Sequence, residues 1–187
     1  MKLILASQSP RRKEILSKAG FVFDIIPSLY DEKVNGKNYT KELIENCAFN
    51  KALDVQKRIG LNFAILSADT VVVLDNLILG KPKDVTDASN ILNSLSNKTH
   101  FVATSICVLY QDKIIKDTEI TKVTFRKLSD YDIKNYIETK KPFDKAGSYA
   151  IQDEGFDFVV NIDGCYDNVV GLPLKLVEKH LSWLKVH

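Results

Sequence analysis

Apolar residues recur with two periods along the chain, and these periods divide its first half into expected strands and helices. Three short apolar runs predict buried strands, at residues 2–6, 21–27 and 63–68. Apolar positions keep helical spacing through residues 40–58, which predicts a long helix that ends at Gly60. Strands and helices therefore alternate in this half, as they do in α/β proteins.

The middle of the chain is richer in signals for antiparallel strands. The extended run continues through residues 71–74, and Asp75-Asn76 predicts a turn into a returning strand at 77–79. Two long β segments follow, at 100–110 and 113–126. The remaining expected elements are a polar loop at 28–39, helices at 86–95, from Ser129 and from Pro173 to Leu184, and a strand at 158–162. Together they predict a single mixed α/β domain over residues 1–187, with a central twisted mixed sheet flanked by helices.

The first expected helix has an unusual start. Ser9-Pro10 places a capping hydroxyl and a proline at its N-terminus, and Gly20 ends it. Its first turn also carries Arg11, Arg12 and Lys13, although cations at a helix N-terminus oppose the helix dipole. Hydroxyls, free backbone N–H groups and guanidinium groups are the donors that hold phosphates. Two interpretations stay open, an anion site or a basic turn facing solvent.

A lone carboxylate lies within the most apolar part of the chain. Asp69 is flanked by apolar runs on both sides, and such a group is costly to bury unless it has a partner or a task. It can bind Mg²⁺ or take a proton from water that attacks phosphorus, and the alternative is an aspartate in a turn at the end of a strand. Lys81 lies only twelve residues further on and across the expected hairpin, so it can bring a cation close to Asp69. Lys51 borders the apolar stripe of the long helix. For Lys51 the simpler interpretation is a side chain that extends to solvent along that stripe.

Composition narrows the range of functions. The 187 residues include 45% hydrophobic and 27% charged residues, the balance of a soluble globular protein. A net charge of +2 argues against a dedicated binder of nucleic acid but leaves a small polyphosphate ligand open. Cys47, Cys107 and Cys165 are widely spaced and form no metal-ligand pattern with the three histidines, so buried free thiols are expected. The N-terminus lacks a signal sequence and no membrane span is apparent, so we expect a cytoplasmic protein.

Five motifs occur in the order found in one family. They are Ser7-Gln8-Ser9-Pro10-Arg11-Arg12, Ser67-Ala68-Asp69-Thr70, Gly80-Lys81-Pro82, Lys145-Ala146-Gly147-Ser148-Tyr149-Ala150-Ile151-Gln152 and Val170-Gly171-Leu172-Pro173. With these motifs the chain resembles the Maf family of nucleoside triphosphate pyrophosphatases from about residue 2 to residue 184. The resemblance implies the Maf/inosine triphosphate pyrophosphatase-like fold, a nucleoside triphosphate substrate, a divalent cation (Mg²⁺ or Mn²⁺) and a homodimer.

The resemblance also implies roles for ten residues. Asp69 would be the proton acceptor and, with Glu32, a metal ligand. Positions that set base specificity in the family correspond to Arg12, Thr70 and Gln152. The polar and basic positions around the triphosphate correspond to Ser7, Ser9, Arg11, Lys51 and Lys81.

The branch of the family can also be argued from these motifs. The branch that acts on dTTP and UTP resembles this chain at Ser9–Arg12, at Ala68–Thr70 and at Gln152, whose amide can pair with the O4/N3 edge of a pyrimidine. Modified pyrimidine nucleotides are further candidates. The alternatives are the branch that acts on 7-methyl-GTP and a non-catalytic nucleotide-binding regulator of septum formation or cell division. One departure is Asp153-Glu154, because glycine more often follows the glutamine in the family.

Overall fold

Seven strands form one sheet in the computed structural model, which describes residues 1–184. They are β1 (Leu3–Leu5), β2 (Phe23–Ile25), β3 (Ala64–Leu74), β4 (Leu77–Leu79), β5 (Thr99–Tyr110), β6 (Lys113–Phe125) and β7 (Val159–Asp163). Their order is β2-β1-β3-β5-β6-β7, and β4 pairs with the far end of β3. The strand β1 is parallel to both neighbours, whereas β5, β6, β7 and β4 pair antiparallel. The predicted mixed sheet flanked by helices is confirmed.

In the described part of the chain, six α-helices connect and cover these strands. They are α1 (Pro10–Lys18), α2 (Lys41–Ile59), α3 (Val85–Leu95), α4 (Asp130–Lys140), α5 (Tyr166–Val170) and α6 (Leu174–Leu181), with 3-10 turns at Ala146–Ser148 and Ser182–Leu184. The helix α1 begins where the sequence predicts, because the Ser9 hydroxyl accepts a hydrogen bond from the Arg12 amide. Ser129 and Asp132 form the predicted capping box of α4.

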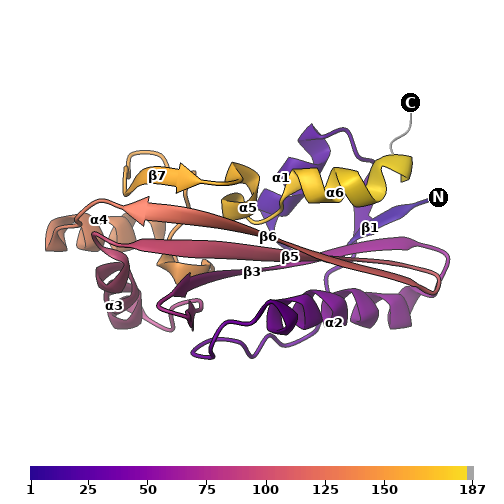
Figure 1. Cartoon of the computed structure of the whole chain (residues 1–187), viewed down its shortest axis with the longest axis horizontal. Helices are drawn as coiled ribbons and strands as arrows, with labels where there is room; N and C mark the ends of the chain where they lie inside the picture. The colour runs from indigo at the N-terminus through magenta and orange to yellow at the C-terminus, as the bar shows by residue number, and fades with distance from the viewer. Residues whose placement is uncertain (185–187) are drawn as a thin grey trace.

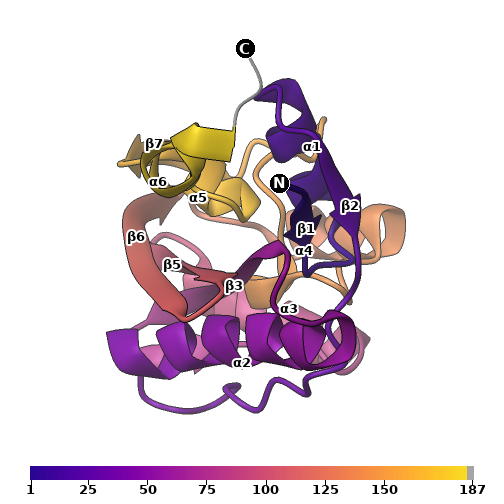
Figure 2. The ribbon, with the colours of Figure 1, turned by 90° about the vertical axis from the view of Figure 1, so that its right-hand side faces the viewer.

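The helices lie in layers on both sides of the sheet (Figures 1 and 2). The long helix α2 covers one face, where Ala48, Ala52 and Val55 pack against Ile4 and Ile65. On the other face, α1 and α6 pack against the alternate side chains of the same strands, among them Leu5, Leu66 and Ala68. Successive side chains of a strand point to opposite faces, so the burial of β1 and β3 on both sides explains the apolar runs of β1 and of the two ends of β3.

The observed elements differ from the expected ones near the C-terminus. The sequence predicts one helix from Pro173 to Leu184, but α6 ends at Leu181 and a 3-10 turn follows. The short helix α5 was not predicted, because five residues are too few to show helical periodicity. The strand expected at residues 21–27 is reduced to β2.

Three smaller expectations concern the cysteines, membrane-spanning helices and the histidines. Cys47 and Cys107 are buried free thiols, as expected, whereas Cys165 is partly exposed. Within residues 1–184, no helix has the length and apolar character needed to cross a membrane. His187, which the sequence gives no role as a ligand, lies outside the described residues.

Candidate active site

A pocket of about 390 Å³ lies beside the middle of β3, where the sheet has a gap. The strand β1 pairs with β3 as far as Leu66, and β4 pairs with it again only from Val72. Between these positions the edge of β3 that faces away from β5 has no neighbouring strand from residues 1–184. The chain leaves β1 at Ala6 and turns into α1, so the gap lies at the carboxyl end of a parallel strand, a common position for ligand sites in α/β sheets.

This pocket brings together all ten residues to which the sequence assigns roles. They are Ser7, Ser9, Arg11, Arg12, Glu32, Lys51, Asp69, Thr70, Lys81 and Gln152. They come from the loop before α1, from α1 itself, from the loop before α2, from α2, β3, the segment after β4 and the turn after Tyr149. Because Asp69 lies inside an 11-residue strand, the alternative of an aspartate in a turn at a strand end is wrong.

One group of charged side chains in the pocket is formed by the buried Asp69 and Lys51 together with the more exposed Glu32. Asp69 is 1% exposed and Lys51 6% exposed, and the Lys51 Nζ donates to Asp69 Oδ1 at 2.6 Å and to the Ala68 carbonyl at 3.2 Å. The same ammonium forms an ion pair with Glu32. Asp69 Oδ2 is buried and has no hydrogen-bond partner among residues 1–184. One oxygen of the carboxylate is thus anchored, and the other is left without a donor.

The loop that carries Glu32 is held over the site by charge. Burial by itself would raise the pKa of Glu32, but the Lys51 ammonium, with weaker contributions from Lys81 and Arg12, lowers it below its usual value. Glu32 is therefore a carboxylate at neutral pH. Lys51 does not extend to solvent along α2, because its ammonium is held between the buried carboxylate of Asp69 and the partly exposed carboxylate of Glu32.

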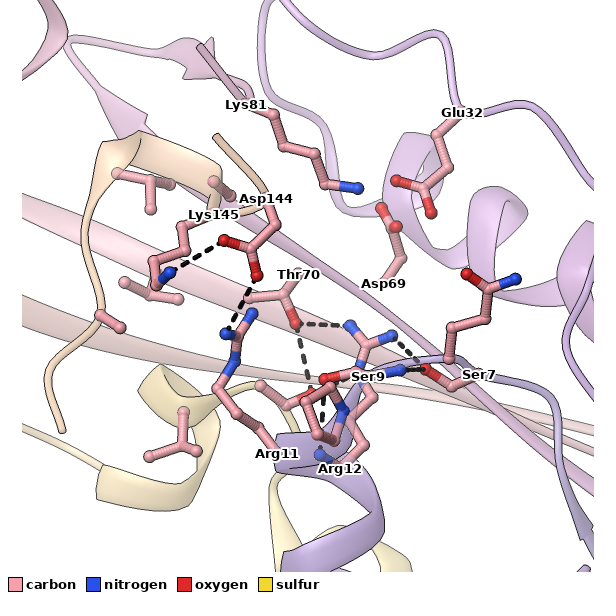
Figure 3. A pocket seen from close by; sticks show the side chains of 18 of the residues that line it. Ser7, Ser9, Arg11, Arg12, Glu32, Asp69, Thr70, Lys81, Asp144 and Lys145 are labelled. Carbon is pink, nitrogen blue, oxygen red and sulfur yellow. Dashed lines mark hydrogen bonds and ion pairs between the residues drawn. The ribbon is translucent and has the colours of Figure 1, made fainter. Parts of the chain in front are cut away.

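Arg12 connects three separate segments of the chain behind the pocket. Its Nε donates to the Gly171 carbonyl at 2.8 Å, its Nη1 to the Ser7 hydroxyl at 3.2 Å and its Nη2 to the Thr70 hydroxyl at 3.0 Å (Figure 3). Burial lowers the pKa of the guanidinium, and the charges of Asp69 and Glu32 partly offset that effect. The fixed fork of an arginine suits such a node, because it donates in several directions at once.

The opposite rim of the pocket carries a second group of charges. Arg11 Nη1 lies 3.5 Å from Asp144 Oδ2, and Lys145 Nζ donates to Asp144 Oδ1 at 2.8 Å (Figure 3). Lys81 points into the pocket and has no hydrogen bond or ion pair within the described residues. With Arg12 and Lys51, five cations face three carboxylates, a surplus of positive charge that suits a polyphosphate.

Some pocket residues were missed by sequence reasoning. Lys145 and Tyr149 stand inside a quoted motif, and Asp144 directly precedes it, so proximity to that motif was the signal that could have found them. The buried Tyr149 hydroxyl lies 2.7 Å from His100 Nε2, and burial lowers the pKa of His100 to about 4. No sequence pattern links these two residues, since β5 and the segment after α4 meet only in the folded protein.

The side chains of the pocket supply only some of the ligands that a divalent cation needs. Asp69 and Glu32 supply two carboxylates close to one cation, Lys51, and Asp69 Oδ2 is an oxygen without a partner among the described residues. Residues 1–184 contain no group of three or more His, Cys, Asp or Glu side chains placed to bind a metal. Mg²⁺ commonly binds through one or two carboxylates together with waters and substrate phosphates, and the residues fit that arrangement.

Comparison with known proteins adds sequence relatives along nearly the whole chain. The family described as "Maf-like protein" matches residues 2–184. A protein of Clostridium botulinum (strain Alaska E43 / Type E3) named dTTP/UTP pyrophosphatase is 47% identical over 185 residues, which are 97% of this chain and 98% of that protein. A protein of the same name from Acholeplasma laidlawii is 47% identical over 96% of this chain and 95% of its own length.

Among solved structures, a nucleoside-triphosphatase / dITP/XTP pyrophosphatase from Mycobacterium abscessus is similar over 68% of this chain and 76% of its own chain. The sequence identity is 17% and the TM-score is 0.49.

Proposed function

The chain belongs to the Maf family, and we propose that it is a nucleoside triphosphate pyrophosphatase that hydrolyses dTTP and UTP to the monophosphate and pyrophosphate. Full-length relatives that are 43–47% identical carry the name of this activity. The observation that carries the proposal is the state of Asp69, a buried carboxylate in the pocket with one oxygen held by Lys51 and the other without a partner among residues 1–184. Such a group is placed to accept a proton.

In the proposed reaction, water attacks the α-phosphorus and pyrophosphate leaves in line with it. Asp69 Oδ2 takes the proton of the attacking water, and Lys51 keeps the carboxylate oriented by holding Oδ1. The cations Arg11, Lys81 and Lys145 and the hydroxyls of Ser7 and Ser9 line the same pocket and would contact the phosphate oxygens. Charge that builds up on those oxygens is stabilised because these groups are already in place before the reaction.

A divalent cation, Mg²⁺ or Mn²⁺, would be held by Asp69 and Glu32 and completed by the triphosphate. When bound, it neutralises phosphate charge and polarises the phosphorus–oxygen bonds. Because the chain offers two carboxylates and Lys51 already lies between them, the free protein should bind the metal weakly and the nucleotide complex more tightly.

Base selection is proposed for Gln152, Arg12 and Thr70, which all line the pocket. Gln152 is exposed and lines the pocket, so its amide can donate to and accept from the edge of a pyrimidine. Arg12 and Thr70 are hydrogen bonded to each other, and Thr70 in turn lies 2.9 Å from the Thr104 hydroxyl. Their donors and acceptors are largely engaged, so they form a fixed part of the pocket wall.

The test is pyrophosphate release from a panel of nucleoside triphosphates, including 7-methyl-GTP, with Mg²⁺ or Mn²⁺. We expect turnover of dTTP and UTP above all others, and the Asp69→Asn variant should lose about 10²–10⁴-fold in kcat, the range supplied by general acid–base catalysis. Turnover of dTTP by Asp69→Asn near the wild-type rate would exclude Asp69 as the base. Tight nucleotide binding without turnover in the wild type would instead favour the regulator.

Two further expectations stay predictions. The family resemblance implies a homodimer, which light scattering of the purified protein would test. Cytoplasmic location would be tested by fractionation of the cells that produce it.

A further inference from the structure

One buried hydroxyl holds both ends of the turn that presents Gln152 to the pocket. The Tyr136 hydroxyl accepts a hydrogen bond from the Ala150 amide at 3.0 Å and donates one to Asp153 Oδ2 at 2.6 Å. The turn itself is closed by a backbone hydrogen bond of 3.2 Å from the Asp153 amide to the Ala150 carbonyl. Gln152 is the third residue of this four-residue turn, between the two anchored ends.

The anchor belongs to a rigid part of the molecule. Tyr136 lies in the middle of α4 and is 1% exposed. Its ring packs edge-on against Phe156, with ring centroids 4.9 Å apart, and more obliquely against Phe158, with centroids 5.0 Å apart. The start of α4 is fixed by its capping box and by Arg126, whose two Nη atoms bind the Asp132 carboxylate at 3.0 and 3.1 Å. The hydroxyl therefore has little freedom to follow the turn if the turn moves.

Gln152 itself has no such support. Its side chain is exposed, and no hydrogen bond fixes it among residues 1–184. An amide that reads a base must be placed to within a fraction of an ångström, and a surface turn alone does not give that precision. The position of Gln152 is therefore set through the ends of its turn, and both ends contact the same hydroxyl.

We propose that Tyr136 is a positioning residue for base selection, which acts by holding the Ala150–Asp153 turn so that Gln152 faces the nucleobase. The inference rests on the proposed function, because it names what sets the selectivity of that same pocket. It also assigns a role to Asp153, which departs from the family pattern. Its carboxylate is bound to Tyr136 behind the turn, so it is an anchor of the turn and not a second group that reads the base.

The first experiment compares base selectivity in four proteins: the wild type, Tyr136→Phe, Gln152→Ala and the double variant. Tyr136→Phe keeps the aromatic ring and removes only the hydroxyl. We expect it to lower the ratio of kcat/KM for dTTP to kcat/KM for a purine triphosphate by about three- to tenfold, mainly through KM for dTTP. In the Gln152→Ala background the same change should lower the ratio no further, because Tyr136 acts through Gln152.

The matched control is Tyr39→Phe. The Tyr39 hydroxyl is also buried, has no hydrogen-bond partner among the described residues and belongs to no wall of the pocket. This variant should keep the wild-type selectivity. If Gln152→Ala lowers the ratio of kcat/KM for dTTP to that for the purine triphosphate and Tyr136→Phe leaves this ratio unchanged, the inference is overturned. An equal further loss in the double variant would also overturn it, since Tyr136 would then act independently of Gln152.

Hydrogen exchange separates a failure of this inference from a failure of the proposed function. In the wild type the Ala150 amide donates to Tyr136, so its exchange should be slow, and it should quicken in Tyr136→Phe but not in Tyr39→Phe. This result does not depend on which nucleotide is hydrolysed. If the wild type does not hydrolyse dTTP or UTP, the proposed function fails and the selectivity role with it. If the Ala150 amide exchanges at the same rate in the wild type and in Tyr136→Phe, the Tyr136 hydroxyl does not anchor the turn.

Discussion

The two ends of the pocket are built in different ways. At the reaction end, Asp69 and Lys51 belong to long regular elements, β3 and α2, and are almost completely buried. At the base end, Gln152 lies in an exposed turn outside regular structure. The first pair is fixed by the packing of the sheet and its helix, whereas the turn is fixed by a few hydrogen bonds from neighbouring elements.

This difference indicates which properties of the site resist change. A buried carboxylate that loses its cation keeps the full cost of its desolvation, so the reaction end should tolerate few substitutions. A turn that is held by a few hydrogen bonds can shift when one of them is removed, with little cost to the stability of the rest of the fold. Substitutions at the reaction end should therefore affect both stability and turnover, and those at the base end mainly selectivity.

The largest expected effect is that of Lys51→Met. The methionine fills a similar volume but leaves the buried Asp69 carboxylate without the ammonium that binds Oδ1. We expect a loss of about 3–5 kcal/mol in the free energy of unfolding, measured by urea denaturation at pH 7, together with loss of turnover.

Lys145→Met is the matched control for that change, since Lys145 also lines the pocket and also pairs with an aspartate. Its partner Asp144 has a side chain that is 63% exposed, so water can replace the lost ion pair. The expected loss is below about 1 kcal/mol. Equal losses in the two variants would contradict the contrast between a buried reaction end and an exposed rim.

The second largest effect depends on pH and concerns His100, which contacts the pocket residue Tyr149. Burial lowers the pKa of His100 to about 4, whereas the unfolded chain should titrate near the ordinary value of about 6.5. Between these values the unfolded state binds a proton that the native state does not, so stability falls as pH falls from about 6.5 to 4. The full difference is on the order of 3 kcal/mol.

His100→Gln removes this titration and keeps a polar partner for the Tyr149 hydroxyl. Urea unfolding of the wild type and of this variant at several pH values should give curves that converge toward pH 4. Parallel curves of unfolding free energy against pH would show that His100 titrates alike in the folded and the unfolded protein.

The reaction end responds to a lower range of pH. Because the pKa of Glu32 is lowered in the folded protein, its contribution to the free energy of unfolding is fully present above the ordinary glutamate pKa and is lost as pH falls from there through the lowered value.

A smaller effect is expected of Gln152→Ala at the base end. The side chain is exposed and makes no hydrogen bond within residues 1–184, so the free energy of unfolding should stay within about 0.5 kcal/mol of the wild type. The preference for dTTP and UTP over other triphosphates should fall by about tenfold, measured as ratios of kcat/KM, because a base-reading hydrogen-bonding group is lost. An equal loss for every base would remove Gln152 from base selection.

The smallest effect is expected at the rim, from Asp144→Asn. The carboxylate partly neutralises Arg11 and Lys145, so its removal leaves more positive charge for the triphosphate. We expect kcat/KM for dTTP to rise about two- to threefold at low ionic strength, and the gain to shrink as salt screens the attraction between these cations and the triphosphate. A gain that persists in high salt would point to a change in the shape of the pocket.

The sequence determined the order of the elements and the identity of the candidate site. Apolar periodicity located β3 and α2, since a buried strand and the buried stripe of a helix leave regular patterns. Local signals located the start of α1 at Ser9-Pro10 and that of α4 at Ser129, because a cap depends on residues only three apart. The five motifs pointed to the family and contain eight of the ten residues that the pocket brings together. The other two, Glu32 and Lys51, lie outside the motifs and were assigned through the resemblance.

Only the tertiary structure decided what these residues do to one another. Lys51 and Asp69 are 18 residues apart, and whether Lys51 reaches solvent or Asp69 depends on how α2 lies across β3. The gap beside β3 arises because β1 ends before β4 begins to pair, a property of strand register that no single segment encodes. The contacts of Tyr136 and His100 likewise join separate elements. Periodicity reports which side of an element is buried, but it does not report which distant residue lies there, and the chemistry of this pocket depends on that pairing.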